Sequence, residues 1–390
     1  MPVTPSRSPK AKAPEHAARP RGADTLALRV VDSPSARLVD RLVEIEGPLV
    51  VGREPGPSGL AVDDSKMSSR HCTIEVDALG QLAFRDEKSK NGSFVRGVRS
   101  PHGTLADGDV LRLGATLFVA TRRGPDGPLE DPGHGLVGLS PAFRTMCAQA
   151  IAAAAGPDPL ALLGDHGVEV DAVARLVHRR GRGADGGPFV VVDCAALRPD
   201  RLDAELFGPT GKARAAHGGT LLLDEVDALD AAAQAALLGL IERRALPAGA
   251  GKRGAPIDVR IVAAVYPELA PAVTSGAFDA ALYARLAATR VVMPPLVDRR
   301  EDILRLVRHE AGVAPGQPLL DGEAAEQLLT YAWPANRREV HQLVMRIAGK
   351  RRPLRQADLP KTVVPGAPPL APAEPIVNNP ALRKRKHQVT

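Results

Sequence analysis

The pattern of apolar residues changes near residue 136, and no single type of domain accommodates both patterns. Before this point, apolar residues fall in short alternating runs between turns, as in 26–30, 72–76 and 110–113. Such alternation is typical of strands with one buried face, and predicts an all-β sandwich. Beyond it, continuous apolar runs such as 160–163 and 220–223 alternate with helical stretches. That second pattern predicts a parallel sheet with helices on both faces.

The chain of 390 residues is long enough for two or three domains. We expect a multidomain protein in which an all-β sandwich precedes an α/β module with a parallel sheet and a small helical lid. The ends, rich in proline, alanine and charge, are predicted to be disordered. The expected boundaries are a tail 1–23, a sandwich 24–122, a linker 123–135, an α/β core 136–312, a lid 313–358 and a tail 359–390.

Cysteine usage and hydropathy indicate a cytoplasmic protein. The cysteines Cys72, Cys147 and Cys194 are far apart and form no CxxC pair, which argues against a disulfide framework or a zinc site. The N-terminus has no apolar signal region, and no apolar run approaches membrane-spanning length. We therefore expect no metal site and no membrane contact.

The net charge of +6 belongs to the tails. Residues 1–23 and 360–390 carry +4 each, which leaves −2 for the body of the chain. The C-terminal tail contains the basic run 383–386. Basic tails bind nucleic acid or anionic lipid loosely, and a solvated tail that aids solubility explains the charge equally well.

Within the β-rich segment, residues suited to binding an anion follow one another in order. Arg53, after Gly52, offers a forked donor for phosphate oxygens. Ser68 and Ser69 offer hydroxyl and backbone donors, and Asn91 precedes a glycine at a turn. A phosphothreonine carries nearly two negative charges and needs several converging donors.

The order GR, SxxH and NG, carried here by Gly52-Arg53, 68–71 and Asn91-Gly92, resembles the forkhead-associated (FHA) domain, a phosphothreonine-binding module. The resemblance implies that Arg53 and Ser68 hold the phosphate. It also implies that Ser69, Lys90 and Asn91 contact the phosphate or the peptide backbone, whereas Gly52 and His71 are structural. An FHA scaffold used only for protein contact is the alternative.

The segment 136–349 resembles the AAA+ domain of bacterial enhancer-binding proteins, the ATP-driven activators of sigma-54 RNA polymerase. The similar stretches are 189–197, 205–208, the strand 218–225 ending in Asp224 and Glu225, and the motif 333–339. The resemblance implies that Asp224 holds the Mg²⁺ shell, that Glu225 polarises water, and that Arg338 is the lid's sensor arginine.

The phosphate loop departs from that family. A working loop needs glycine N–H groups around the phosphates and a lysine that reaches the β- and γ-phosphates. At the matching positions Gly164 and Gly167 remain, but Val170 replaces the lysine and Glu169 replaces a glycine. We expect the lost cation and the added carboxylate to oppose triphosphate binding.

Other departures agree with a loss of hydrolysis. Val265-Tyr266 replaces the polar pair of the first sensor, Asp279 replaces one arginine finger so that Arg285 alone remains, and Asp193 replaces an asparagine. The run 208–212 resembles a phosphate loop but lacks its strand–loop–helix setting. Between Gly208 and Gly218 the family's long sigma-contacting loop is missing, and no helix-turn-helix follows residue 359.

These observations predict a phosphothreonine-dependent regulatory protein with a pseudo-ATPase module and no catalytic residues or cofactor. Its expected partner is a threonine-phosphorylated protein, with an intact AAA+ relative or a second copy of the chain as further candidates. We do not expect direct sequence-specific DNA binding. The alternative is an ATP- and Mg²⁺-binding sigma-54-dependent regulator with weak ATPase activity, supported by Asp224, Glu225, Arg285 and Arg338. Nucleic-acid binding through the basic tail is a third hypothesis.

Overall fold

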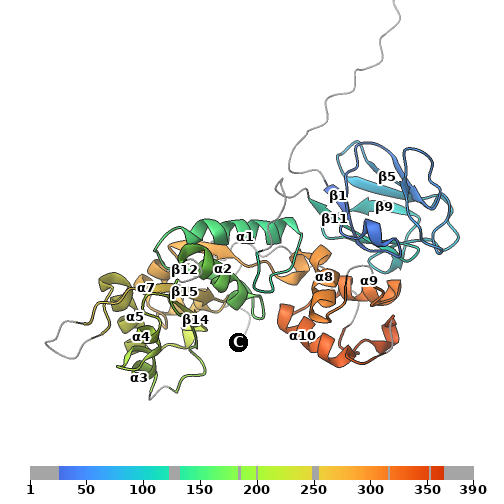
Figure 1. Ribbon diagram of the computed structural model, residues 1–390. Helices are drawn as coiled ribbons and strands as arrows, with labels where there is room; N and C mark the ends of the chain where they lie inside the picture. The colour runs from blue at the N-terminus through green and yellow to red at the C-terminus, as the bar shows by residue number, and fades with distance from the viewer. Residues whose placement is uncertain are drawn as a thin grey trace, which may run out of the picture.

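A computed structural model of the protein describes residues 26–122, 132–182, 186–198, 201–247, 254–314, 317–350 and 353–363. A β-sandwich, an α/β core and a group of helices follow one another along the chain (Figure 1). The predicted disordered tail 1–23 lies outside the described residues, as do residues 123–131 of the predicted linker 123–135 and residues 364–390 of the predicted disordered tail 359–390. Within the described residues, no helix combines the length and the apolar character needed to cross a membrane.

The sandwich consists of a six-stranded and a five-stranded sheet. Leu28, Phe84, Leu111 and Phe118 fill the space between them. All neighbouring strands are antiparallel except β3 and β4. The first sheet has the order β2-β1-β11-β10-β7-β8, from β1 (Leu26–Asp32), β2 (Leu42–Val43), β7 (Ser93–Val95), β8 (Val98–Arg99), β10 (Val110–Leu113) and β11 (Thr116–Arg122). The second has the order β4-β3-β5-β6-β9, from β3 (Leu49–Gly52), β4 (Leu60–Ala61), β5 (Cys72–Val76), β6 (Leu82–Asp86) and β9 (His102–Leu105).

The α/β core contains a five-stranded sheet with the order β13-β14-β15-β12-β16. All its strands run parallel. They are β12 (Leu160–Leu163), β13 (Phe189–Asp193), β14 (Thr220–Asp224), β15 (Arg260–Val265) and β16 (Thr289–Val292). One face is covered by α1 (Pro141–Ala154) and α2 (Val170–Arg182). The other is covered by α3 (Leu202–Phe207), α4 (Lys212–Ala215), α5 (Ala231–Arg243), α6 (Leu269–Ser275) and α7 (Ala280–Leu286). Helices on both faces explain why β12 and β14 read as continuous apolar runs.

The helical unit is larger than the expected lid. It consists of α8 (Arg300–Glu310), α9 (Gly322–Thr330) and α10 (Asn336–Ile347), which pack around Trp333. Ile303 and Leu306 of α8, which precede the expected lid start at 313, belong to the same apolar cluster. Leu359 and Val363, which follow the expected lid end at 358, are also buried in that cluster.

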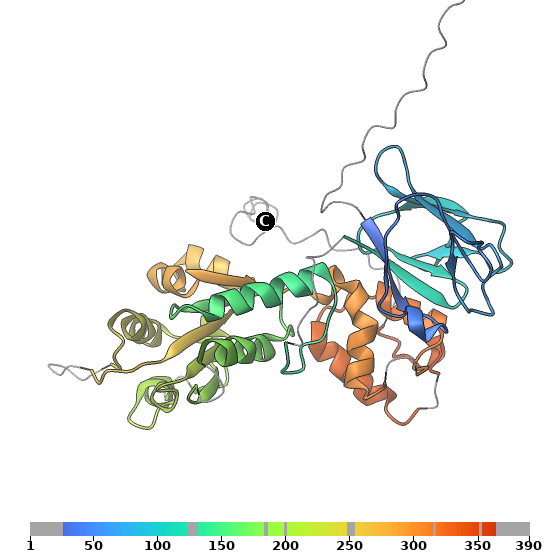
Figure 2. The same cartoon turned by 45° about the horizontal axis from the view of Figure 1, so that its top comes forward.

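The sandwich and the helical unit share an apolar core, and the two lie side by side in both views (Figures 1 and 2). Residues of β11 alternate between two interiors: Phe118 and Ala120 face the sandwich core, while Leu117 and Val119 pack with α8 and α9. This second contact surface is what we call the sandwich–lid interface.

Polar contacts complete the sandwich–lid interface. Arg112 donates to Glu326 of α9 at 2.7 Å, and both side chains are largely buried. The other carboxylate oxygen of Glu326 accepts the Gly97 backbone N–H at 2.9 Å. Arg308 of α8 pairs with Asp32 of β1. Buried ion pairs of this kind fix the relative placement of two elements because either charge alone is costly to bury.

Candidate functional site

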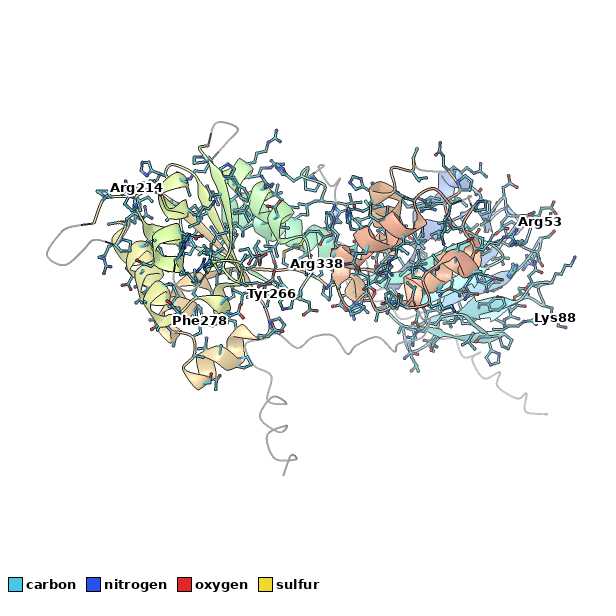
Figure 3. All side chains as sticks on the ribbon, turned by 90° about the horizontal axis from the view of Figure 1, so that it is seen from below. Arg53, Lys88, Arg214, Tyr266, Phe278 and Arg338 are labelled. Atoms are coloured by element: carbon cyan, nitrogen blue, oxygen red, sulfur yellow. The ribbon has the colours of Figure 1, made fainter. Side chains whose placement is uncertain are left out.

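The first half of the expected phosphate site lies where β3 ends. The Arg53 N–H donates to the Ser68 carbonyl at 3.0 Å and the Glu54 N–H donates to the Ser69 carbonyl at 2.9 Å, so the two loops run alongside each other. A side chain on Gly52 would overlap the Ser69 carbonyl, which explains the glycine before the arginine. Arg53 is exposed at the end of the sandwich far from the α/β core (Figure 3).

His71 is buried and holds two loops together. Its Nδ1 accepts the Ser68 N–H at 3.1 Å, and its Nε2 lies 3.2 Å from the Gly92 carbonyl. Since Nδ1 is an acceptor, Nε2 carries the proton and donates to that carbonyl. Burial lowers the pKa of His71 and so favours this neutral form. The structure thus places His71 as a brace between the loops.

The second half of the site is the loop from 86 to 93, which Asp86 organises. Its carboxylate accepts the Ser89 N–H at 2.8 Å, the Ser89 hydroxyl at 2.7 Å and the Ser93 hydroxyl at 2.6 Å. Burial alone raises the pKa of Asp86, but these hydrogen bonds outweigh it and the net shift is downward. The loop therefore presents Lys90 and Asn91 on a fixed backbone.

Hydrogen bonds bring all the predicted phosphopeptide residues into these adjoining loops. The Lys90 N–H donates to the Ser68 Oγ at 3.0 Å, which leaves the hydroxyl proton of Ser68 free to donate to a phosphate. The Asn91 amide donates to the Lys66 carbonyl at 2.6 Å. The Ser69 hydroxyl donates to Glu54 at 3.3 Å, so this hydroxyl is engaged within the protein in this conformation.

In the α/β core, the loop at the position expected for the phosphate loop joins β12 to α2. Gly164 and Gly167 keep the close backbone approaches of such a loop: Gly164 lies against Met293, and Gly167, with a φ of +82°, lies against Ala335. Val170 begins α2, and its side chain is buried in the cluster that α1 and α2 form with the sheet. The side chain at the position of the missing lysine therefore points into the core.

Glu169 does not face the space where phosphates would lie, contrary to our expectation that its carboxylate would repel a polyanion. Its side chain is 1% exposed and forms an ion pair with Arg299, which is fully buried. A buried carboxylate is stable only beside such a partner. Glu169 thus fastens the loop to the residue that precedes α8.

The acid at the end of β14 is held by a tyrosine. The Tyr266 hydroxyl donates to Asp224 Oδ1 at 2.7 Å, and burial raises the pKa of Tyr266, which keeps its hydroxyl proton available for this hydrogen bond. The His166 ring stacks on Tyr266 with centroids 4.1 Å apart, and His166 lies 3.4 Å from Glu268. Glu225 follows Asp224 with a left-handed φ of 51°.

The lid contacts this loop directly. The Asn336 amide donates to the His166 carbonyl at 3.1 Å, and the Arg338 N–H donates to the Gly167 carbonyl at 3.3 Å. Arg338 and Tyr266 lie near each other where the core meets the lid (Figure 3). Gly164, Gly167, Val170, Asp224, Glu225 and Arg338 therefore lie in or around one loop.

Arg285 is separate from this group. It lies on α7 and pairs with Glu242 of α5 at 3.2 Å, with more than half of its side chain exposed. No contact within the described residues joins Arg285 to the loop around Gly167.

Sequence reasoning missed the residues that hold these loops in place. Asp86 is not among the site residues predicted from the sequence, although a carboxylate three residues before a serine is a recognisable turn signal. Arg299 carried no signal at all, because it lies in a run of charged residues that reads as exposed surface. The contacts of His166 with Tyr266 and Glu268 join positions that are far apart in the sequence.

Taken together, these features define a protein with an FHA-type β-sandwich and an AAA+-type α/β module with a lid. The family model of the FHA domain matches residues 49–114, and that of the sigma-54 interaction domain matches residues 136–292. The chain therefore carries an FHA domain followed by a sigma-54 interaction domain.

Relatives and solved structures are similar to part of the chain. The transcriptional regulatory protein XylR of Pseudomonas putida is 38% identical over 227 residues, 54% of this chain and 40% of that protein. The response regulator protein PilR of Pseudomonas aeruginosa is 35% identical over 257 residues, 61% of this chain and 57% of that protein. The chain thus spans about half the length of these relatives.

The fold is also similar to that of NtrX from Brucella abortus. Its structure in complex with ADP matches with a TM-score of 0.53 and 29% identity, over 60% of this chain and 57% of that one. Its structure in complex with ATP matches with a TM-score of 0.52 and 28% identity, over 58% of this chain and 57% of that one.

Proposed function

We propose that the protein is a phosphothreonine-dependent regulatory protein of bacterial transcription control whose AAA+ module does not hydrolyse ATP. The observation that carries the proposal is a contrast between its two anion loops. In the FHA domain, Arg53 is exposed and the Ser68 hydroxyl has a proton to donate. In the AAA+ module, the position of the phosphate-binding lysine is a valine buried in the core.

Phosphothreonine binding is supported by the donors in the FHA loops. The Arg53 guanidinium and the Ser68 hydroxyl lie on loops that are fixed by His71 and Asp86. Charge-assisted hydrogen bonds from such preorganised donors contribute about 1.5–3 kcal/mol each. The ligand is a protein phosphorylated on threonine.

Loss of ATP turnover is supported by what occupies the phosphate loop. Val170 offers no cation, Glu169 forms an ion pair with Arg299, and Asp224 accepts a hydrogen bond from Tyr266. A Mg²⁺-bound triphosphate needs the lysine and a free aspartate together. The AAA+ module then serves as an interaction surface for an intact relative or for a second copy of the chain.

Calorimetric titration tests both halves of the proposal. We expect a threonine-phosphorylated peptide to bind the full chain, the unphosphorylated peptide not to bind, and ATP·Mg²⁺ to give no heat up to millimolar concentration. Arg53→Ala should weaken peptide binding by about 10- to 100-fold, the equivalent of losing one or two charge-assisted hydrogen bonds. Arg41→Ala, at the opposite edge of the sheet from β8, is the matched control.

The outcomes test phosphothreonine binding and the lack of ATP turnover separately. Clear ATP binding would overturn the argument from Val170 against triphosphate binding while leaving the phosphopeptide half of the proposal intact. Equal binding of phosphorylated and unphosphorylated peptides would overturn the phosphothreonine half. If the module co-assembles with an intact relative, the relative's ATPase rate should fall as this protein is added, and an unchanged rate at saturation would exclude that partner.

The second candidate is an ATP-binding sigma-54-dependent regulator with residual activity. The observation in its favour is that Asp224, Glu225 and Arg338 remain gathered around the loop. ATP turnover that Glu225→Gln abolishes would establish it, because that variant removes the group that polarises water.

A further inference from the structure

Arg99 occupies a specific place beside the proposed phosphothreonine site. It lies on β8 directly opposite Phe94 of β7, and Phe94 in turn lies opposite Arg112 of β10. The Arg99 side chain folds back over Gly92, where a β-carbon would lie 3.1 Å from its Cζ and Nη2 atoms. Its guanidinium therefore lies against the residue that follows Asn91.

The positive charge of Arg99 is not used within the described part of the protein. Other arginines of the sandwich pair with carboxylates: Arg112 with Glu326 at 2.7 Å, Arg85 with Glu87 at 3.0 Å, and Arg96 with Asp109. Arg99 is exposed, and among the described residues no hydrogen bond or ion pair engages its guanidinium. An arginine packed on a backbone with its donors open is preorganised for an anion.

The surroundings favour an anion at this position. Lys90 and Lys88 on the neighbouring loop are exposed and add positive potential, and their ammonium groups too have no partner among the described residues. The carboxylates of that loop are engaged elsewhere: Asp86 accepts the Ser89 and Ser93 hydroxyls, and Glu87 accepts the Thr73 hydroxyl and pairs with Arg85. A second negative group of a ligand could therefore bind the N–H donors of Arg99, Lys88 and Lys90 without competing with a carboxylate of this loop.

We propose that Arg99 binds a second acidic group of the phosphothreonine ligand and so makes the site selective for acidic sequences. The inference rests on the proposed function, since the ligand must already be held at Arg53 and Ser68. The group recognised is an anionic side chain close to the phosphothreonine, either a carboxylate or a second phosphate. Arg99 bonds both with its planar fork of N–H donors.

Peptides in matched sets test this proposal on the full chain. Each set carries one phosphothreonine, and a flanking position, scanned on both sides, holds alanine, glutamate or a second phosphothreonine. We expect the best acidic peptide to bind about 10-fold more tightly than its alanine counterpart, the equivalent of one added charge-assisted contact. The glutamate and phosphothreonine arms show which anion the site prefers.

In Arg99→Gln, the dissociation constants of the acidic peptide and of its alanine counterpart should agree to within about twofold, because only the anion-binding group is removed. Arg41→Gln, an exposed arginine beside β2 at the opposite edge of the same sheet, should leave the ratio unchanged. Circular dichroism and thermal unfolding of each variant check that the sandwich is folded.

The possible failures are distinguishable. No preference for acidic peptides in the unaltered protein, or a preference that survives Arg99→Gln, overturns the role of Arg99 while Arg53-dependent binding still stands. Failure of every phosphothreonine peptide to bind overturns the proposed function, and the inference with it.

Discussion

At the scale of single residues, three substitutions in and around the phosphate loop are structurally connected. Val170 packs into the core, Glu169 pairs with Arg299, and Tyr266 donates to Asp224. Each of these side chains is therefore engaged by other parts of the protein. The replacement of lysine and glycine could be seen in the sequence, but their new partners could not, because those partners depend on the tertiary fold.

Val170→Lys tests whether the loop can be restored by one residue. We expect the variant to gain no ATP binding and to unfold at a lower temperature, because an ammonium at this buried position costs several kcal/mol. Thermal unfolding and calorimetric titration measure the two effects, with Val168→Lys at a partly buried position of the same loop as control. ATP binding without loss of stability would contradict the buried role of Val170.

His71 predicts a pH dependence of the FHA domain. Because its pKa is lowered in the folded state, the unfolded state binds a proton that the folded state does not. The stability is thus fully present above a pH of about 6.5, the ordinary histidine pKa, and falls as the pH drops toward the folded pKa. His71→Gln should flatten the unfolding temperature between pH 5 and pH 7, without peptide present. An equally steep profile in the variant would exclude His71 as the source.

At the scale of elements, α8 illustrates what the sequence concealed. Residues 298–302 read Asp-Arg-Arg-Glu-Asp, which looks like a solvated surface, yet Arg299 and Asp302 are fully buried. Asp302 accepts hydrogen bonds from the Leu139 and Ser140 N–H groups at 2.6 and 2.9 Å. The strand β11 departs from the alternation expected before residue 136: it contains a continuous apolar run, because the sandwich–lid interface buries its second face.

Glu301 makes the sandwich–lid interface sensitive to pH. It accepts the Thr121 hydroxyl at 2.7 Å, and burial, followed by the nearby Asp302 charge, raises its pKa from 4.5 to about 7. The folded state therefore holds a proton that the unfolded state has lost, so stability falls as the pH rises from 4.5 to about 7. This difference amounts to about 3 kcal/mol at 1.36 kcal/mol per pKa unit.

Glu301→Gln keeps the shape of the side chain and removes its ionisation. We expect the variant to be more stable than the unaltered protein at pH 8 and close to it at pH 4.5. Thermal unfolding across this range measures the difference. A variant that is destabilised equally at both pH values would show that ionisation of Glu301 does not govern the interface.

At the scale of the whole molecule, the order of domains was predictable but their union was not. Alternating and continuous apolar runs distinguished the sandwich from the α/β core, and short motifs located both loops. The sandwich–lid interface joins residues hundreds of positions apart, such as Arg112 and Glu326. Leu117 and Val119 are apolar residues of this interface, and nothing in the sequence predicts that they pack against the lid helices.

Excision of residues 24–122 tests this union. We expect the isolated sandwich to unfold at a lower temperature than in the full chain and to self-associate, because Val31, Val110, Leu117 and Val119 lose their cover. Complete burial of each such side chain contributes about 1.5–3 kcal/mol. Leu117→Ser with Val119→Thr in the excised domain should restore the monomer. A monomeric excised domain of undiminished stability would contradict a shared core.

The sandwich–lid interface also fixes a distance. Arg53 lies at the end of the sandwich far from the α/β core, and a shared core rather than a flexible tether holds the two parts (Figure 3). Flexible linkers let two bound partners sample many separations, whereas a stiff connection permits only one. We therefore expect a ligand bound at Arg53 to be held at a set spacing and orientation relative to the lid.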